Sequence, residues 1–122
     1  DELMMVSDQQ GTPTWTVDVS TTLVRLLETR PEGLFHYAAR GYTTRYDTAL
    51  AILEKSGLTG KTLTPCRTAD FPSPARRPLN SRFACPKLEN ALEIERPPWQ
   101  ESLARFLRTS QGLRDKQAAA AS

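Results

Sequence analysis

The chain has 122 residues, enough for one domain with a modest hydrophobic core. Its formal net charge of +2 and its 25% share of charged residues are ordinary for a globular protein, so charge alone gives no argument for a nucleic-acid partner. The sequence shows neither an apolar run near the roughly 20 residues of a membrane span nor a basic-then-apolar leader, so we expect a cytoplasmic protein with no membrane partner. Cys66 and Cys85 have no metal-binding spacing, and we expect reduced thiols.

Two strands and a helix are predicted in the first 40 residues. The apolar run at residues 3–6 is typical of a strand, and a polar turn follows it. A helix then begins near Thr16, which can cap it, and ends before Pro31 and Gly33. Its apolar face is predicted from helical spacing and consists of Val19, Leu23, Leu26 and Leu27. Residues 34–38 are apolar and predict a second strand.

A second helix, a third strand and a short third helix are predicted in the next part of the chain. Thr44 with Asp47 three residues later resembles a capping box, which begins a helix that stops near Gly57. Residues 62–64 predict a third short strand. Pro86 is suited to the first position of a short helix.

The last helix is expected directly after Pro98. Its apolar face consists of Trp99, Leu103, Phe106 and Leu107. Apolar periodicity ends beyond Gly112, so we assign residues 1–110 to one domain and residues 111–122 to a tail. Strands alternating with helices favour an α/β or α+β unit, and its thin sheet has edges that need a partner.

The loop at residues 70–81, DFPSPARRPLNS, combines three prolines with two adjacent arginines. Each proline fixes φ and removes a backbone donor, so Pro72, Pro74 and Pro78 indicate an ordered or extended connector. Arg76 and Arg77 on such a backbone suit an anion, because a guanidinium can donate two parallel hydrogen bonds to phosphate. Alternatively, the two arginines only pair with acidic neighbours such as Asp70.

The turn at residues 8–14, DQQGTPT, follows a predicted strand and precedes a predicted helix, which is where α/β proteins bind ligands. Gln9, Thr12 and Thr14 offer amide and hydroxyl groups, and Gly11 would let a phosphate or sugar approach the backbone. A plain strand-to-helix turn with a threonine cap explains the same residues.

Four motifs occur in one order: residues 8–14, GLFHYAARGYTTRYD at residues 33–47, residues 70–81, and PPWQESLARFL at residues 97–107. Together they resemble the C-terminal half of the dTDP-4-dehydrorhamnose reductase family, over residues 3–107. The family belongs to the extended short-chain dehydrogenase/reductases, in which an N-terminal Rossmann domain holds NADPH or NADH and a smaller C-terminal region closes over a nucleotide-sugar. The resemblance implies that a dTDP-sugar diphosphate is bound by Gln9, Thr14, Arg76 and Arg77, with Asn80 and Ser81 as weaker candidates.

The cofactor fingerprint and the catalytic pair of that family are missing from the sequence. The six glycines form no G-x-G-x-x-G or G-x-x-G-x-x-G pattern. None of the three tyrosines has a lysine four residues later. We therefore assign no catalytic, cofactor-binding or metal-binding residue. We interpret the chain as a fragment or separately encoded half, inactive alone, whose partner is the Rossmann half or a partner subunit.

A second hypothesis is a non-catalytic interaction or regulatory module, because a relative in this superfamily serves as a regulatory subunit. Arginines locked in internal ion pairs beside an exposed apolar patch would favour it, whereas free arginines beside a polar cleft would favour substrate binding.

Two positions depart from the family pattern. Arg45 stands where an aromatic residue commonly precedes the tyrosine, which bears on local packing or substrate shape. Thr109 stands where some relatives place a glutamate for a magnesium-linked dimer, so we assign neither metal nor dimer.

Overall fold

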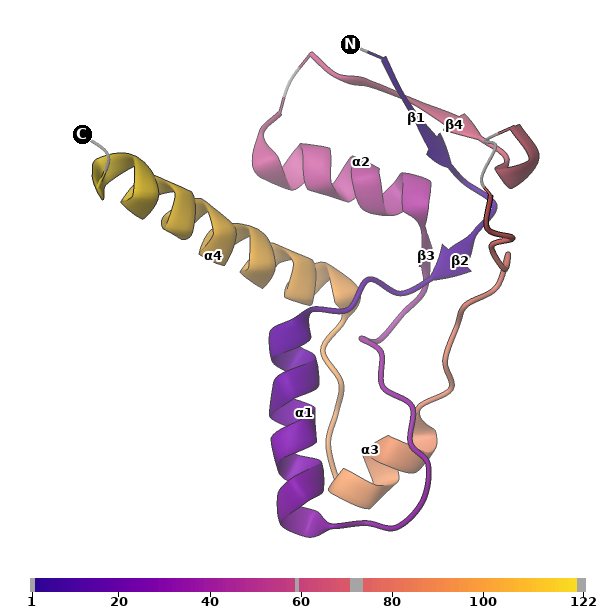
Figure 1. Cartoon of the computed structure of the whole chain (residues 1–122), viewed down its shortest axis with the longest axis vertical. Helices are drawn as coiled ribbons and strands as arrows, with labels where there is room; N and C mark the ends of the chain where they lie inside the picture. Colours follow the sequence, from indigo (N-terminus) through magenta and orange to yellow (C-terminus); the bar gives the residue numbers. More distant parts are fainter. Residues whose placement is uncertain (1, 59, 71–73, 121–122) are drawn as a thin grey trace.

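The computed structural model describes residues 2–58, 60–70 and 74–120, and side chains as far as residue 110. The mixed α/β fold that the sequence predicts is confirmed (Figure 1). Its elements run in the order β1 (Glu2–Val6), β2 (Gln10–Gly11), α1 (Thr16–Thr29), β3 (Thr43–Thr44), α2 (Arg45–Ser56), β4 (Thr62–Cys66), the 3-10 turn η1 (Thr68–Asp70), α3 (Pro86–Leu92) and α4 (Trp99–Ala120). Helix α2 packs against β1 and β4, and α1 packs against α3. None of the described helices is long and apolar enough to cross a bilayer.

Two small sheets bring distant parts of the chain together. Strands β1 and β4 are parallel, with Met4 opposite Thr64, and β2 and β3 are antiparallel, with Gln10 opposite Thr44. Gln10 also pairs on its other side with Asn80. Its amide donates to the Leu79 carbonyl at 2.8 Å, and its own carbonyl accepts from the Ser81 amide at 2.8 Å. The turn after β1, the start of α2 and the end of the loop at residues 70–81 (the arginine loop) therefore meet around β2.

The core is small. Its buried apolar residues are Val6, Ala38, Ala39, Cys66, Cys85, Leu88, Leu92 and Trp99. Leu88 and Cys85 are the most completely enclosed of these, together with Ala39. Cys66 and Cys85 are free, as the sequence predicts. A core of this size leaves little reserve of buried apolar area to stabilise the chain.

Most predicted helix ends are confirmed. The hydroxyl of Thr44 accepts from the backbone amide of Asp47 at 3.0 Å, and α2 ends at Gly57, whose φ of 64° lies in the left-handed region. Helix α3 begins with Pro86, as predicted. Helix α4 begins directly after Pro98 but continues to Ala120, so residues 111–120 are helical and the predicted end near Gly112 is wrong. The division into a domain and a tail stays a prediction.

The predicted cap of α1 is wrong, and its predicted buried face is correct only in part. Trp15 is the N-terminal flanking residue and gives no side-chain cap, while Thr16 is already helical. The buried residues of this helix are Asp18 and Thr22. Of the predicted face, Val19 and Leu26 are partly buried, whereas Leu23 and Leu27 are 53% and 73% exposed. Asp18 is buried because it accepts from the hydroxyl of Ser102 at 2.6 Å and pairs with Arg105, both on α4. A polar contact between helices therefore decides which face of α1 turns inward.

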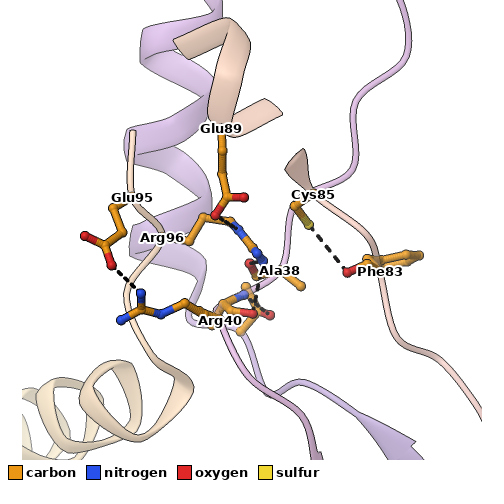
Figure 2. Close-up of polar contacts among 9 residues, drawn as sticks. Ala38, Arg40, Phe83, Cys85, Glu89, Glu95 and Arg96 are labelled. Carbon is orange, nitrogen blue, oxygen red and sulfur yellow. Dashed lines mark hydrogen bonds and ion pairs between the residues drawn. The ribbon is translucent and has the colours of Figure 1, made fainter. Parts of the chain in front are cut away.

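The predicted strand at residues 34–38 is also absent. No described strand forms a ladder with this segment, and lysine and arginine side chains satisfy two of its carbonyl groups instead. Lys87 Nζ donates to the Leu34 carbonyl at 3.0 Å, and Arg96 Nη1 donates to the Ala38 carbonyl at 2.7 Å. Figure 2 shows the guanidinium of Arg96 lying between Ala38 and Glu89. A strand needs a neighbour for its backbone groups, and apolar sequence alone does not supply one.

Candidate functional site

A cavity of about 670 Å³ opens where the turn after β1, the start of α2 and the end of the arginine loop meet. It is lined by Met5, Gln9, Gln10, Gly11, Thr12, Pro13, Thr43, Thr44, Arg45, Thr48, Ala49, Ile52, Arg77, Pro78 and Ser81. Its lining is apolar on the α2 side, at Ala49 and Ile52, and carries hydroxyl and guanidinium groups around them. It contains no carboxylate. The cavity lies within the size range of small-molecule sites in proteins.

The sequence-predicted binding residues divide between this cavity and its surroundings. Gln9, Arg77 and the weaker candidate Ser81 line it. Thr14, Arg76 and Asn80 do not. The first group comes from two segments about 70 residues apart in the sequence, joined by the hydrogen bonds between Gln10 and residues 79–81. The binding role of each predicted residue stays a prediction.

Arg76 and Arg77 are exposed, and neither forms an ion pair or hydrogen bond with any residue that the structure describes. The expected alternative, a pair with Asp70, is not formed. The Asp70 carboxylate instead accepts from the backbone amide of Arg67 at 3.1 Å. Pro72 lies outside the described residues, so the stiffness that we predict from it stays a prediction. The guanidinium of Arg77 is therefore available to a ligand in the cavity.

Thr14 and Asn80 make local contacts beside the cavity. The hydroxyl of Thr14 accepts from the Ala39 amide at 3.2 Å and donates to the Thr12 carbonyl at 3.2 Å, which fastens the turn to residues 38–39. The side-chain oxygen of Asn80 accepts from the backbone amide and the Nε of Arg82, at 3.1 and 2.9 Å. In these positions both side chains hold the loops in shape.

Gln9 belongs to a chain of side-chain hydrogen bonds that runs from Asp8 to Arg45. Its Nε2 donates to the Thr68 hydroxyl at 3.1 Å, and its Oε1 accepts from Arg45 Nε at 3.0 Å. The Thr68 hydroxyl in turn donates to Asp8 Oδ1 at 2.6 Å. This last bond is the main reason that the pKa of Asp8 is lowered from its ordinary value of 3.8, because it stabilises the charged carboxylate.

Sequence reasoning noted Arg45 only as a departure from the family pattern, and it missed Thr68. The sequence signal for Arg45 was its position directly after the Thr44 cap. Strand β3, which ends at Thr44, pairs with β2 in the turn after β1, so the first residue of α2 must lie near that turn. No local pattern marks Thr68. It reaches Asp8 because β1 and β4 are parallel neighbours whose carboxyl ends lie side by side, 60 residues apart in the sequence.

A second cavity, of about 690 Å³, lies between α1, residues 93–98 and α4. Asp18, Tyr37 and Arg105 contribute to its wall, and burial raises the pKa of the Tyr37 phenol above 10.0. None of the predicted binding residues lines it. Asp18 pairs with Arg105 Nη2 and accepts from the Ser102 hydroxyl across α1 and α4, whereas the buried Nε of Arg105 has no hydrogen-bond partner among the described residues.

Residues 1–111 match the family model described as RmlD substrate binding domain. The chain belongs to this family. The dTDP-4-dehydrorhamnose reductase of Escherichia coli (strain K12) is 33% identical over 117 residues, an alignment that covers 88% of this chain and 39% of that enzyme. The solved dTDP-4-dehydrorhamnose reductase of Clostridium acetobutylicum is 34% identical, with a TM-score of 0.85, over 91% of this chain and 39% of that chain.

The enzyme of the same name from Bacillus anthracis, solved in complex with NADP, is 28% identical, with a TM-score of 0.82 over 89% of this chain. The chain therefore spans about 39% of the length of the curated relatives that it matches.

The sequence of this RmlD-family chain carries no glycine fingerprint of a Rossmann dinucleotide cradle. The turn between β1 and α1 contains Gly11 alone, where a Rossmann cradle has three glycines. A Cβ added at Gly11 would meet the Cβ of Ser81 at 3.8 Å, an ordinary van der Waals contact, so the packing around this position does not require glycine. In the described part of the chain no three His, Cys, Asp or Glu side chains are grouped as metal ligands.

Proposed function

We propose that this chain is the substrate-binding domain of an NAD(P)H-dependent dTDP-4-dehydrorhamnose reductase, and that the cavity beside Arg77 receives the diphosphate of a dTDP-sugar. The complete enzyme would transfer a hydride from the nicotinamide to the 4-keto group of dTDP-6-deoxy-L-lyxo-4-hexulose, giving dTDP-L-rhamnose. The single observation that carries the proposal is an unpaired guanidinium on a carboxylate-free cavity in a chain of this family. A diphosphate is the part of such a substrate that a guanidinium recognises best.

The role of the chain in that reaction is binding and orientation. Contacts with the remote diphosphate would hold the keto-sugar against the cofactor, and binding energy gained far from the reacting carbon lowers the barrier by fixing geometry. The hydride donor and the catalytic pair would come from the rest of the reductase fold, in the same chain or in a partner subunit. The curated relatives are long enough to contain both parts.

The unpaired state of Arg77 also supports substrate binding over a regulatory module. A module that uses this surface only to contact another protein does not require a positive, carboxylate-free cavity, and the internal ion pairs expected for locked arginines are not formed among the described residues. We therefore keep substrate binding as the proposed function.

The proposal is tested by titrating the 122-residue chain with dTDP-L-rhamnose and following the shifts of its backbone amides by NMR, which detects weak binding. We expect shifts at residues 9–12, 43–45 and 77–81. Replacement of Arg77 by alanine removes a charge-assisted contact, so Arg77→Ala should weaken binding by roughly tenfold to hundredfold, and Arg77→Lys should recover part of the loss.

Arg76→Ala is the matched control, because Arg76 is the adjacent exposed arginine on the same loop and does not line the cavity. It should leave the affinity within a factor of about two, as expected for a solvent-screened charge. Equal losses in both variants, or no amide shifts around the cavity, would show that the arginine loop does not hold the sugar nucleotide.

A further inference from the structure

We propose that Arg45 is the second phosphate-binding arginine of the cavity and that Asp8, Thr68 and Gln9 position its guanidinium. This assignment rests on the proposed function, which places a diphosphate there, and adds a residue at which this chain departs from the family pattern. Its basis is the hydrogen-bonded chain that ends at Arg45 Nε and the place of Arg45 in the cavity lining.

In this series of hydrogen bonds from Asp8 to Arg45, the direction of each bond follows from the negative charge on Asp8. The carboxylate can only accept, and it takes the single proton of the Thr68 hydroxyl at 2.6 Å and the Thr68 backbone proton at 3.0 Å. With its proton committed, the Thr68 oxygen can only accept from Gln9, so it binds the amide nitrogen of that residue at 3.1 Å. The amide orientation of Gln9 is thereby fixed.

The orientation of Gln9 then fixes Arg45. The remaining polar atom of the Gln9 amide is its oxygen, which accepts from Arg45 Nε at 3.0 Å. Both ends of the Gln9 amide are engaged in this way, so Gln9 is a positioning residue. The terminal nitrogens of Arg45 have no partner in the part of the chain that the structure describes. They form the pair of donors that matches two phosphate oxygens.

The surroundings of Arg45 favour an anion with more than one negative charge. Arg45 and Arg77 both line the cavity, and none of the lining residues is acidic. Arg45 is also the first residue of α2, where the helix dipole adds positive potential. The nearest carboxylate on α2, Asp47, is held by the Thr44 hydroxyl at 2.6 Å and is not among the lining residues. A diphosphate bridging the two guanidinium groups satisfies both.

The test uses inorganic pyrophosphate as the probe, because it isolates the anion site from recognition of the sugar and the base. The 122-residue chain is titrated with pyrophosphate by NMR, with thymidine in a parallel titration. We expect Arg45→Ala to weaken pyrophosphate binding roughly tenfold to hundredfold, and Arg45→Lys to recover part of it. Arg108→Ala removes the same charge from an exposed site on α4 and should change the affinity less than about twofold.

Thr68→Val tests the positioning step, since Thr68 is not among the lining residues. It should weaken pyrophosphate binding by roughly twofold to tenfold and shift the Arg45 Nε proton resonance, which a purely local packing change would leave in place. Amide dispersion in the same spectra reports whether each variant is folded. If Thr68→Val does not fold, Gln9→Leu interrupts the same series of hydrogen bonds.

The outcomes separate this inference from the proposed function. Pyrophosphate binding that depends on Arg45 supports the inference even if dTDP-L-rhamnose fails to bind, in which case only the proposed substrate is wrong. Equal pyrophosphate affinities for Arg45→Ala and Arg108→Ala would overturn the inference, even if dTDP-L-rhamnose binds through Arg77.

Discussion

Asp8 stands at one end of the series of hydrogen bonds that reaches the candidate site at Gln9 and Arg45. Its carboxylate receives two hydrogen bonds from Thr68 through one oxygen and a third contact through the other, at 3.1 Å from the Thr68 amide. These bonds exist in the folded chain only, because they join the turn after β1 to the residue that follows β4 by two positions. The ionised state of Asp8 is therefore linked to the contact between the turn after β1 and the residues after β4.

This link predicts a pH dependence. The folded chain lowers the pKa of Asp8 below 3.8, chiefly through the Thr68 hydroxyl, so the unfolded state binds the proton more readily. Asp8 therefore contributes stability at pH values above its unfolded pKa, and the contribution is lost as the pH falls from about 4 through the lower folded pKa. Carboxyl-carbon NMR titration measures this pKa, which Thr68→Val should move back toward 3.8.

Thr48→Val is the control for this titration. Thr48 is a nearby hydroxyl residue on α2 that donates to the carbonyl of Thr44, the N-cap of that helix, at 2.8 Å. Its replacement should leave the Asp8 pKa where it is in the unchanged chain. An Asp8 pKa that does not move in Thr68→Val would mean that the hydroxyl is not the group that stabilises the carboxylate.

Single residues of the site were predictable from sequence only where their motif is local. Arg77 could be selected because it lies in a short segment whose residue types suit phosphate, and Gln9 could be selected because its turn resembles the family motif; both line the cavity. The positioning role of Gln9 could not be predicted, because it depends on Thr68, which comes close only through the β1–β4 pairing. Thr14 has the same chemistry as Thr12 in the sequence, yet only Thr12 lines the cavity.

Between elements, Arg96 donates hydrogen bonds to carbonyl groups of residues 38–39, which a neighbouring strand would satisfy if this segment were part of a sheet. Its Nε donates to Glu89 Oε1 on α3 at 2.7 Å, and its Nη1 donates to the Ala38 and Ala39 carbonyls at 2.7 and 3.3 Å (Figure 2). The side chains of Arg96 and Glu89 are 12% and 26% exposed. This largely enclosed ion pair joins α3, residues 38–39 and the segment leading into α4.

Arg96→Ala should therefore lower the free energy of unfolding by about 2 to 4 kcal/mol, because it leaves a largely enclosed carboxylate and two carbonyl groups without their donor. Chemical denaturation followed by circular dichroism measures the loss. Arg40→Ala is the matched control: Arg40 pairs with Glu95 in the same region, but their side chains are 50% and 75% exposed. That exposed pair should be worth less than about 1 kcal/mol.

Similar losses in Arg96→Ala and Arg40→Ala would indicate that the enclosed pair is no more important to stability than the exposed one.

The comparison also tests why the strand prediction for residues 34–38 failed. Apolar alternation and β-branched or aromatic content describe a single segment, whereas a strand is a property of two neighbouring segments. In the described chain the neighbours of residues 34–38 are side-chain donors from α3 and the segment before α4.

The helices were predicted more accurately than the strands because their signals are local. The Thr44 cap, the Gly57 terminus and the Pro86 start each depend on residues within a few positions of one another, and all three are confirmed. The inward face of α1 was predicted only in part, because a count of apolar positions does not include Asp18. That carboxylate finds its partners on α4, 84 and 87 residues away in the sequence.

At the scale of the whole molecule, the chain leaves unusually much apolar surface in water. Helix α1 turns Val17, Leu23, Val24 and Leu27 outward, and Leu34 is 76% exposed. The β1–β4 sheet has two strands and is parallel, a type of sheet that is normally covered on both faces. Since the relatives are more than twice as long as the aligned part, we propose that the rest of the reductase fold covers some of these surfaces.

The 122-residue chain should accordingly be marginally stable or self-associating by itself, because its core is small and apolar surface that lacks a cover drives association. Sedimentation velocity at several concentrations, with thermal unfolding of the same samples, measures both properties.

Replacing Leu23 and Leu27 together by glutamine should shift the chain toward monomer with little change in melting temperature, because both side chains are already exposed. Leu88→Gln is the opposite case, since Leu88 is 1% exposed, and it should unfold the chain. A concentration-independent monomer with a high melting temperature would contradict the idea that α1 lacks its natural cover and would favour an autonomous module.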